Sequence, residues 1–343
     1  MQEMADDRHT HNGPRLVCHA AEDFRPTASI ERLRLRAELL RAVRDFFHAR
    51  GFLEVETPLL CADTVVDRHL DPFAVDVPQG PNKPPRRMWL QTSPEFCMKR
   101  LLAVGSGPIF QVARAFRQDE FGPLHNPEFT IVEWYRPGDD LLGAMQLTSE
   151  LCHALLRRGP AELLTYAHAF QQFVGIDPHR ADSAALARRV AELGVQAPQS
   201  LAADDRDGWL DLLLSHCVSP RLGIERPVLL YHYPTSQAAL AKVRNDDPPV
   251  AERFELYVSG VELANGYQEL CDPDELRRRM AAANAQRRAD GKPPLPEQSR
   301  LLEAMRAGLP AGAGVALGFD RLVMLAAGAN NLAEVLAFPF DRA

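Results

Sequence analysis

The sequence predicts an α+β fold in which a mostly antiparallel sheet is flanked by helices. Several strand-like segments follow one another without the regular strand–helix alternation of a parallel α/β protein. Amphipathic helix patterns begin at Ile30 and at Asp272. Of the 343 residues, 46% are hydrophobic and 25% are charged, as in an ordinary globular protein.

The first element is a helix that starts at Ile30. Its apolar residues recur at helical spacing as far as Phe47, and Ser29 is a suitable N-terminal cap. Gly51 can adopt the left-handed conformation that ends a helix. Residues 52–58 then have the pattern of a strand that is stopped by a proline.

Later elements follow from apolar runs and turn residues. Residues 78–87 are rich in proline and glycine, which predicts an exposed loop between two strands. The stretch from 159 to about 220 is mixed and mostly helical, and Asn265-Gly266 predicts a turn. Asp272-Pro273 starts a helix that Gly291 ends. The remaining predictions are strands at 88–90, 109–112, 228–233, 253–258 and 312–318, and helices at 95–104 and 139–158.

The bulk properties restrict the classes of function. No apolar run is long enough for a membrane helix, and the first 15 residues lack the apolar stretch of a signal peptide. The six cysteines are scattered without metal-ligand spacing, so we expect reduced thiols in a cytoplasmic protein. A net charge of −7 weighs against a large nucleic-acid surface. Residues 1–28 are polar and aperiodic, which predicts a flexible tail before one domain at 29–343.

Two distant arginines carry most of the functional information. Arg117 lies in the segment 116–120, which reads Phe-Arg-Gln-Asp-Glu, and Arg321 closes the glycine-rich segment 312–321. A guanidinium is planar and stays charged, so one at each place could hold two phosphates of the same nucleotide. The pairing suggests an enzyme that activates a carboxylate with ATP.

Each segment alone also has a purely structural interpretation. A short Phe-Arg-x-Asp pattern arises easily by chance, and a glycine-rich strand is weaker still. Neither segment contains the lysine of a P-loop or the glycine pattern of a dinucleotide fold. Separately, each would be interpreted as structural, but their order and spacing make chance a poor explanation.

The segments 50–60, 116–133 and 312–321 resemble motifs 1, 2 and 3 of the class II aminoacyl-tRNA synthetases. Their surroundings are similar to the lysyl branch, and most of all to its short paralogues, the elongation factor P–(R)-β-lysine ligases. The likeness spans about residues 30–343, with no room for an anticodon-binding domain. Further matching segments are 91–95, 125–130, 132–137, 262–266 and 341–343.

The resemblance implies an ATP site. Arg117 would hold the α-phosphate, Arg321 the γ-phosphate of a bent ATP, and these two would be the catalytic residues. Phe129 would stack on the adenine ring. The other implied ATP contacts are Gln118, Asp119, Asn126, Glu262, Leu263 and Gly318. Such a site needs positioned charges rather than a nucleophile.

The resemblance also implies a magnesium site and an acidic substrate pocket. Glu262 and Glu269, on either side of the predicted Asn265-Gly266 turn, would bind Mg²⁺; alternatively they are exposed strand-end acids. A lysine-like substrate carries two ammonium groups, which calls for carboxylates. The implied substrate contacts are Ser93, Pro94, Glu95, Glu133, Tyr135, Asn265, Tyr267, Glu269 and Ala316. Ser93 and Ala316 stand where lysyl-tRNA synthetases usually have alanine and glycine, which fits a β-amino substrate.

The chain departs from the family pattern at three positions. Gln118-Asp119 replaces the usual Asn-Glu, which shortens the acid by one methylene, and Glu120 could substitute for it. Tyr267 replaces the usual phenylalanine, adding a hydroxyl that needs a partner. None of these changes removes a charge that the mechanism requires.

The implied activity is a two-step, ATP- and Mg²⁺-dependent ligation. (R)-β-lysine would be activated as an adenylate and transferred to a lysine ε-amino group of elongation factor P, and motif 1 would form a homodimer. One alternative is a free-standing domain that activates α-lysine for a tRNA or small-molecule acceptor. A second is a catalytically inactive relic that senses an amino acid.

Overall fold

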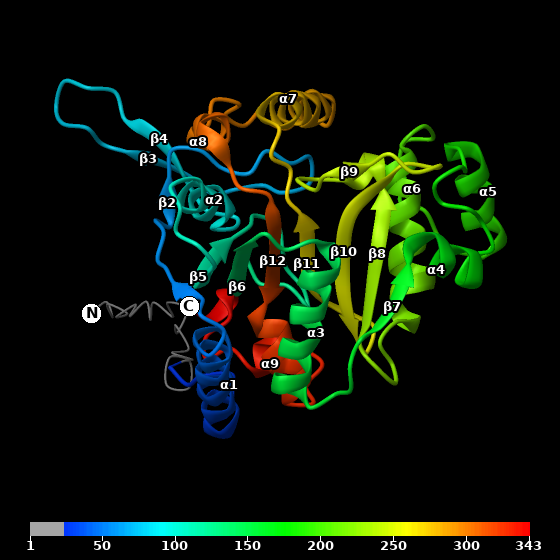
Figure 1. Ribbon diagram of the computed structural model, residues 1–343, viewed down its shortest axis with the longest axis horizontal. Helices are drawn as coiled ribbons and strands as arrows, with labels where there is room; N and C mark the ends of the chain where they lie inside the picture. The colour runs from blue at the N-terminus through cyan, green and yellow to red at the C-terminus, as the bar shows by residue number, and fades with distance from the viewer. Residues whose placement is uncertain (1–23) are drawn as a thin grey trace, which may run out of the picture.

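The computed structural model describes residues 24–343, and a large sheet forms its centre (Figure 1). Neighbouring strands are antiparallel except for the β1–β5 and β7–β8 pairs, which are parallel. The predicted α+β class with a mostly antiparallel sheet is therefore confirmed. In sheet order the strands are β1 (Leu53–Glu54), β5 (Ile109–Phe116), β6 (Glu128–Pro137), β12 (Gly312–Gly318), β11 (Val261–Gln268), β10 (Val250–Val258), β8 (Val228–Pro234) and β7 (Glu162–Thr165), and β9 (Val243–Arg244) pairs with β10.

One face of the sheet packs on the main hydrophobic core. Helices α1 (Ile30–His48), α3 (Leu141–Leu156) and α9 (Phe319–Ala326) contact one another and cover this face. Side chains alternate along a strand, so every second residue of the central strands points into this core. Examples are Val132, Trp134, Leu256, Val315 and Leu317. The intervening residues face the opposite side, which is where the site lies.

The ends of α1 agree with the sequence prediction. Ser29 accepts a hydrogen bond from the backbone N–H of Arg32, and Gly51 has a φ of 75°. The residues before the helix are also fixed, because the N–H groups of Thr27 and Ala28 donate to the carbonyls of Ala337 and Leu336. The ordered domain thus begins before residue 29, and residues 1–23 of the predicted tail lie outside the described part of the chain.

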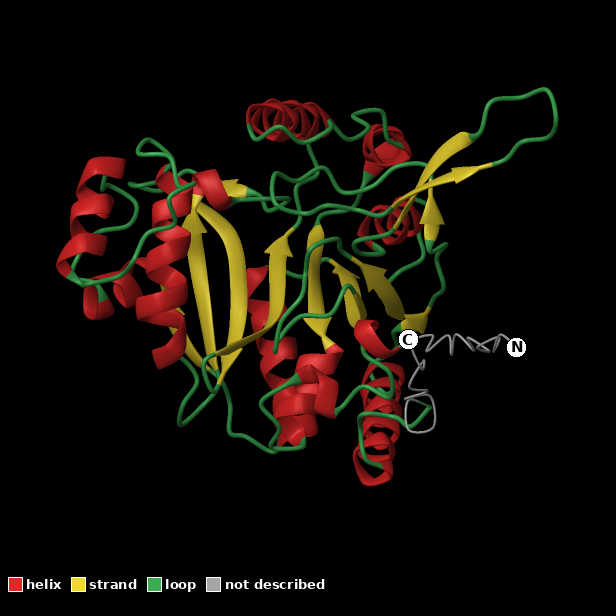
Figure 2. Cartoon of the chain, turned by 180° about the vertical axis from the view of Figure 1, so that it is seen from behind, coloured by secondary structure: helices red, strands yellow, loops and turns green. Residues whose placement is uncertain are grey.

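The mixed region after residue 159 forms a helical layer with its own core beside β8 and β10. It contains α4 (Tyr166–Phe173), α5 (Ser183–Glu192) and α6 (Arg206–Leu213), followed by the short helices η1 (Leu214–Val218) and η2 (Ser219–Arg221). Figure 2 shows this layer at one end of the sheet. Its position makes it one wall of the cavity described below.

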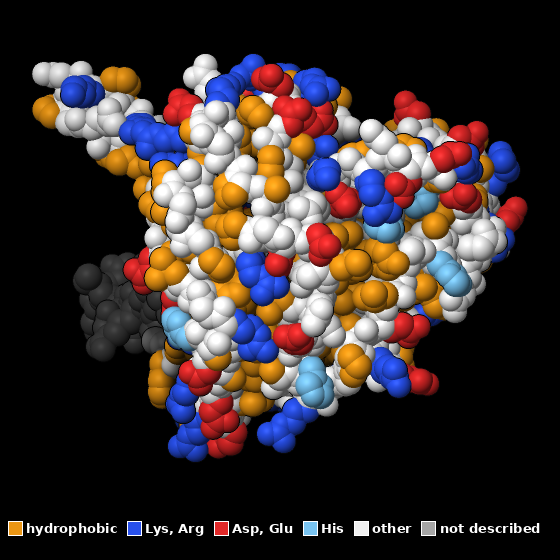
Figure 3. Space-filling view, in the orientation of Figure 1, with side chains coloured by type: hydrophobic (Ala, Val, Ile, Leu, Met, Phe, Trp, Pro, Cys, Tyr) orange, Lys and Arg blue, Asp and Glu red, His pale blue; other side chains and the backbone are white. Residues whose placement is uncertain are grey.

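The opposite face of the sheet carries α2 (Glu95–Ala103), α7 (Pro273–Ala289) and α8 (Arg300–Gly308). A small sheet joins this side, made of β2 (Leu60–Cys61), β3 (Ala74–Val77) and β4 (Arg86–Leu90). The β3–β4 hairpin projects from the body, as the predicted loop at 78–87 implied, and basic side chains gather along it (Figures 1 and 3). Acidic and basic groups are interspersed over the rest of the molecular surface seen in Figure 3. In the part of the chain that is described, no helix is long and apolar enough to cross a membrane.

Two local predictions were wrong. The strand expected at 52–58 shrinks to Leu53–Glu54, and its pairing with β5 ends with the hydrogen bond from the Val55 N–H to the carbonyl of Phe110. Asn265-Gly266 forms no turn but lies inside β11, opposite Glu255 and Phe254 of β10. A Cβ at position 266 would collide with the Phe254 ring, so this glycine allows close packing in a strand.

Candidate active site

The period of two along the central strands gathers the predicted substrate residues on one face. Glu133 of β6 lies opposite Ala316 of β12, which lies opposite Asn265 of β11. Tyr135, Tyr267 and Glu269 follow on the same face of their strands. Together with α2, the strands line a cavity of about 850 Å³. Of the predicted substrate residues it contains Ser93, Glu95, Glu133, Tyr135, Asn265, Tyr267, Glu269 and Ala316, whereas Pro94 only precedes the first turn of α2.

Glu133 is the most deeply buried acid of this cavity, with 1% of its surface exposed. Its two oxygens accept hydrogen bonds from the hydroxyls of Tyr135 (2.5 Å) and Ser93 (2.7 Å). Burial and the charge of Glu95 raise the pKa of Glu133 to about 8, against the lowering effect of these two donors. A buried carboxyl in this state is stabilised in its charged form by an arriving ammonium group.

Lys99 is a buried member of the site that the sequence analysis did not identify. Its ammonium lies 2.5 Å from Glu95 one helical turn earlier, and it also forms an ion pair with Glu269. Burial opposes the charged form of Lys99, but Glu269 and Glu95 outweigh it and raise its pKa. The sequence signal was present: Glu95 and Lys99 have the spacing of facing residues on a helix, in a segment that is otherwise largely apolar.

The floor of the cavity depends on small residues. A Cβ at Gly314 would collide with the Tyr135 ring and with Glu269, so packing alone requires this glycine. The hydroxyl of Ser93 is shared between Glu133 and the backbone N–H of Glu95. Ser93 therefore orients the Glu133 carboxylate and holds the backbone at the start of α2, which is a more specific role than the change of shape predicted from the sequence.

Arg117 lies at one end of the cavity, just after β5. Its guanidinium is 4.9 Å from the centre of the Phe129 ring and 3.3 Å from Glu120. Its Nε donates to the carbonyl of Thr92. These contacts hold the side chain across the cavity wall and leave its charge partly accessible. The Phe129 face is covered by Arg117, so the predicted stacking of adenine on Phe129 stays a prediction.

Arg321 lies in the first turn of α9, and its side chain reaches two other segments. It donates to the carbonyls of Leu124 (3.1 Å) and Glu262 (3.0 Å), and its Nη2 lies 2.8 Å from Nε2 of His125. Burial, then the charge of Arg321, lowers the pKa of His125, so the ring is a neutral acceptor. Both Arg321 and Arg117 favour the charged form of Glu262, so the two guanidinium groups lie within electrostatic reach of the same carboxylate.

The other predicted ATP residues have different surroundings. Gln118 and Asp119 are exposed in the loop after β5. Asn126 holds the C-terminal segment, because its Oδ1 accepts from the backbone N–H of Phe340. Leu263 is buried in the main core, so only its backbone can face a ligand. A Cβ at Gly318 would meet nothing closer than 3.8 Å. Packing does not require glycine there, and the free space suits a ligand.

The structure does not bring Glu262 and Glu269 together. Seven residues of extended chain separate their Cα atoms by roughly 23 Å, at about 3.3 Å per residue. Glu269 contacts Lys99, and the acid that acts on Glu262 is Glu255 of the neighbouring strand β10. Apart from burial, the Glu255 charge is the largest influence that raises the pKa of Glu262, whose side chain stays 40% exposed. The expected pairing depended on the turn at Asn265-Gly266, which does not form.

Arg253 and Glu255 were missed because their strand was assigned from its apolar residues alone. Both point into the cavity from β10, opposite Tyr267 and Asn265. Glu255 accepts from Arg253 (2.6 Å) and from the Tyr257 hydroxyl (2.6 Å). Two charged residues at alternating positions of a buried strand would have been a usable signal.

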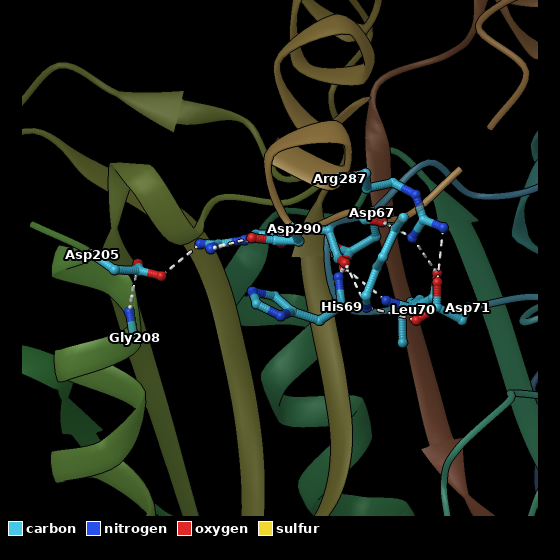
Figure 4. Close-up of polar contacts among 10 residues, drawn as sticks. Asp67, His69, Leu70, Asp71, Asp205, Gly208, Arg287 and Asp290 are labelled. Carbon is cyan, nitrogen blue, oxygen red and sulfur yellow. Dashed lines mark hydrogen bonds and ion pairs between the residues drawn. The ribbon is translucent and has the colours of Figure 1, made fainter. Parts of the chain in front are cut away.

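A loop crosses the cavity on the side away from the sheet; we call residues 65–71 the strap. Arg287 of α7, with 1% of its surface exposed, donates to the carbonyls of Asp67 and Leu70 and to the carboxylate of Asp71. Arg68 joins Asp205 of α6 (2.7 Å) to Asp290 after α7 (2.8 Å). Figure 4 shows how these contacts connect the strap to both helices.

Comparison with known proteins agrees with this geometry. The family model of the class II tRNA synthetases (D, K and N) matches residues 19–342. The chain is 47% identical over 320 residues to the elongation factor P–(R)-β-lysine ligase of Salmonella arizonae, and 48% identical to that of Salmonella gallinarum. Each alignment covers 93% of this chain and 98% of the relative.

The mostly antiparallel sheet carries Arg117 just after β5 and Arg321 just after β12, and the relatives match nearly the whole chain. The chain belongs to the class II tRNA synthetase family (D, K and N), in the group of the elongation factor P–(R)-β-lysine ligases.

Proposed function

We propose that this protein is an ATP-dependent ligase that activates (R)-β-lysine as an adenylate and transfers it to a lysine of elongation factor P. The observation that carries the proposal is the buried acid cluster of Glu95, Glu133 and Glu269, which lies beside Arg117 in one cavity. The acids suit the two ammonium groups of a diamine, and the arginine suits its carboxylate and the α-phosphate. The names of the curated relatives support the choice of substrate and acceptor.

In the first step, a carboxylate oxygen of β-lysine attacks the α-phosphorus of ATP. The bond from that phosphorus to the bridging oxygen breaks, and pyrophosphate leaves with the electron pair. Arg117 would stabilise the charge that builds on the α-phosphate, and Arg321 would hold the far end of the triphosphate. Both are held by backbone carbonyls before ATP binds, so little reorganisation is needed.

Glu262 and Glu255 are the residues that would hold Mg²⁺. Hard carboxylate oxygens on adjacent strands, with Glu262 partly exposed and its proton affinity raised by Glu255, fit that ion. Bound Mg²⁺ would supply neutralisation of phosphate charge. Glu269, with its ion pair to Lys99, would belong to the amino-acid side of the site.

In the second step, the ε-amino group of the acceptor lysine attacks the acyl carbon. An amide bond forms, the acyl–oxygen bond breaks, the amine loses a proton, and AMP leaves. The strap over the cavity would limit the access of water to the adenylate. We place this reaction in the cytoplasm, with elongation factor P in place of tRNA.

We also propose a homodimer formed through the segment 50–60. β1 lies at one end of the sheet in the described part of the chain. Leu53 on this strand is 55% exposed and Leu59 is 41% exposed, although both are large apolar residues. A second copy would cover them.

Pyrophosphate exchange tests the proposal against its alternatives. With ATP and Mg²⁺, exchange should be faster with (R)-β-lysine than with α-lysine. Preference for α-lysine would support the free-standing lysyl-activating domain instead. Absence of exchange with every lysine isomer would support the inactive amino-acid sensor.

A further inference from the structure

We propose that Lys99 is a positioning residue that sets the charge of the substrate cavity, so that it selects a ligand with two ammonium groups. The inference rests on the proposed function and concerns how its substrate is chosen. The contacts of Lys99 fix how many negative charges its ammonium faces. Within residues 24–343, the carboxylates that surround the Lys99 ammonium are those of Glu95, Glu133 and Glu269.

The contacts of Lys99 are internal to the protein. It is 2% exposed, and its ammonium is held by Glu95 from its own helix and by Glu269 from the end of β11. β6 contributes Tyr135, whose ring centre lies 5.9 Å from the ammonium, and Glu133. Cys271 lies within electrostatic reach beyond Glu269. Helix α8 packs on α2 through apolar residues and adds no charge to the contact.

When all three carboxylates are ionised, the ammonium of Lys99 balances one of them. The cavity then carries two negative charges that need a cation. (R)-β-lysine supplies two ammonium groups, while its carboxylate faces Arg117. A ligand with one ammonium would leave one of these buried carboxylates without a cation, which is unfavourable. Without Lys99 the same cavity would need three positive charges. Lys99 thereby converts a cavity for a trication into a cavity for a dication.

The raised pKa values of the Glu133 and Glu269 carboxyls agree with this arrangement. Burial, together with Glu95, raises the pKa of Glu133 to about 8. Burial raises the pKa of Glu269 to about 7, although the charge of Lys99 acts in the opposite direction. Some protons therefore occupy the cluster near neutral pH, and they should leave when the diamine arrives. Binding should release protons, which calorimetry in buffers of different ionisation enthalpy measures directly.

The test compares Lys99→Met with Arg100→Met. Both substitutions remove one cation from α2, but Arg100 is half-buried and its guanidinium contacts Cys97 outside the acid cluster. Lys99→Met should raise the KM for (R)-β-lysine in pyrophosphate exchange by at least about tenfold at pH 7. The three carboxylates then need one cation more than the substrate supplies, so the defect should grow as the pH is raised towards 9 and the carboxyls of Glu133 and Glu269 ionise. The KM of Lys99→Met for ATP should stay near that of the unaltered enzyme. In Arg100→Met, the KM for ATP, the KM for (R)-β-lysine and its pH dependence should all stay near those of the unaltered enzyme.

Chemical rescue separates a charge role from a purely structural one. In Lys99→Ala, added methylammonium can occupy the space of the lost ammonium and should restore a low KM, whereas methanol should not. An unchanged KM and pH profile in Lys99→Met would overturn the proposal. So would a Lys99→Ala protein that stays unfolded or inactive with methylammonium, because Lys99 would then be structural.

The activity of the unaltered enzyme separates a failure of the proposed function from a failure of the proposed role of Lys99. If it activates no lysine isomer, the proposed function fails, while proton release on binding (R)-β-lysine still tests Lys99. If it activates (R)-β-lysine and Lys99→Met behaves identically, only the role of Lys99 fails.

Discussion

Arg117 and Arg321 show why two residues in different parts of the chain can serve one nucleotide. Each is fixed by backbone carbonyls: Thr92 for the first, and Leu124 and Glu262 for the second. A guanidinium that is already oriented loses little side-chain entropy when a phosphate binds. Both charges also favour the charged form of the Glu262 carboxyl, so both lie within electrostatic reach of it.

Arg117→Ala and Arg321→Ala should each lower the rate of adenylate formation by about 10²–10³-fold or more, as for loss of a donor to a developing charge. Pyrophosphate exchange measures the loss, and circular dichroism checks the fold. Arg114→Ala is the matched control, since Arg114 is exposed on β5 and pairs only loosely with Glu128 (3.7 Å). Near-normal exchange in either variant would mean that the nucleotide site is misplaced.

Glu133 should make the stability of the unliganded protein depend on pH. Its pKa rises from 4.5 to about 8 on folding, because of burial and Glu95. A carboxyl with a raised pKa loses its stabilising contribution as the pH rises from about 4.5 to 8. When the pH is raised from 5.5 to 8, the Tm of the Glu133→Gln variant should therefore fall less than the Tm of the unaltered protein.

Thermal unfolding over that pH range measures the difference, and Glu128→Gln, exposed on the same strand, serves as the control. Excess (R)-β-lysine should also reduce the loss of Tm in the unaltered protein. Parallel curves for the unaltered protein and Glu133→Gln would show that Glu133 does not titrate in this range.

At the scale of elements, the strap connects the helical layer to the cavity. Arg68 bridges Asp205 and Asp290, and it does so from a position that is 23% exposed. Such partly exposed pairs contribute little to global stability, about 0–1 kcal/mol each. Their effect should be local: they keep residues 65–71 over the substrate.

Arg68→Ala should leave Tm nearly unchanged but increase proteolysis within the strap and the release of AMP without acceptor, because water reaches the adenylate. Limited proteolysis and an AMP assay check this, with Arg87→Ala as control, since Arg87 pairs with Asp76 on the exposed hairpin. The same protease sensitivity and AMP release in both variants would argue against a role for Arg68 in closing the cavity.

Local signals explain which elements were predictable. α1, α3 and α7 have caps or apolar periods that act within a few residues, so their positions followed from the sequence. The turn predicted at Asn265-Gly266 was wrong because Gly266 is needed in a strand, where it packs tightly against Phe254. That contact depends on strand pairing between residues that a local pattern does not relate.

The site also combines residues with a local sequence signal and residues whose role depends on distant contacts. All the substrate residues implied by the resemblance except Pro94 line one cavity. Lys99, Arg253 and Glu255 were not found, since their importance comes from partners on other elements: Glu269, Tyr233 and Glu262. The strap was missed for the same reason, because its partners lie on α6 and α7.

For the whole molecule, the two ends of the sheet differ. Leu53 on β1 lies on the proposed dimer surface, whereas Leu163, 50% exposed on β7, lies at the other end. Leu53→Asp should therefore convert the dimer to a monomer, while Leu163→Asp should not. Light scattering after size-exclusion chromatography measures both; an unaltered protein that is already monomeric would contradict the dimer proposal.

The most direct test of the whole account is the intact mass of elongation factor P after incubation with this enzyme, ATP, Mg²⁺ and (R)-β-lysine. The account predicts a gain of one β-lysyl group, dependent on Arg117 and absent when ATP is omitted. An unchanged mass, or equal or faster modification with α-lysine, would contradict it.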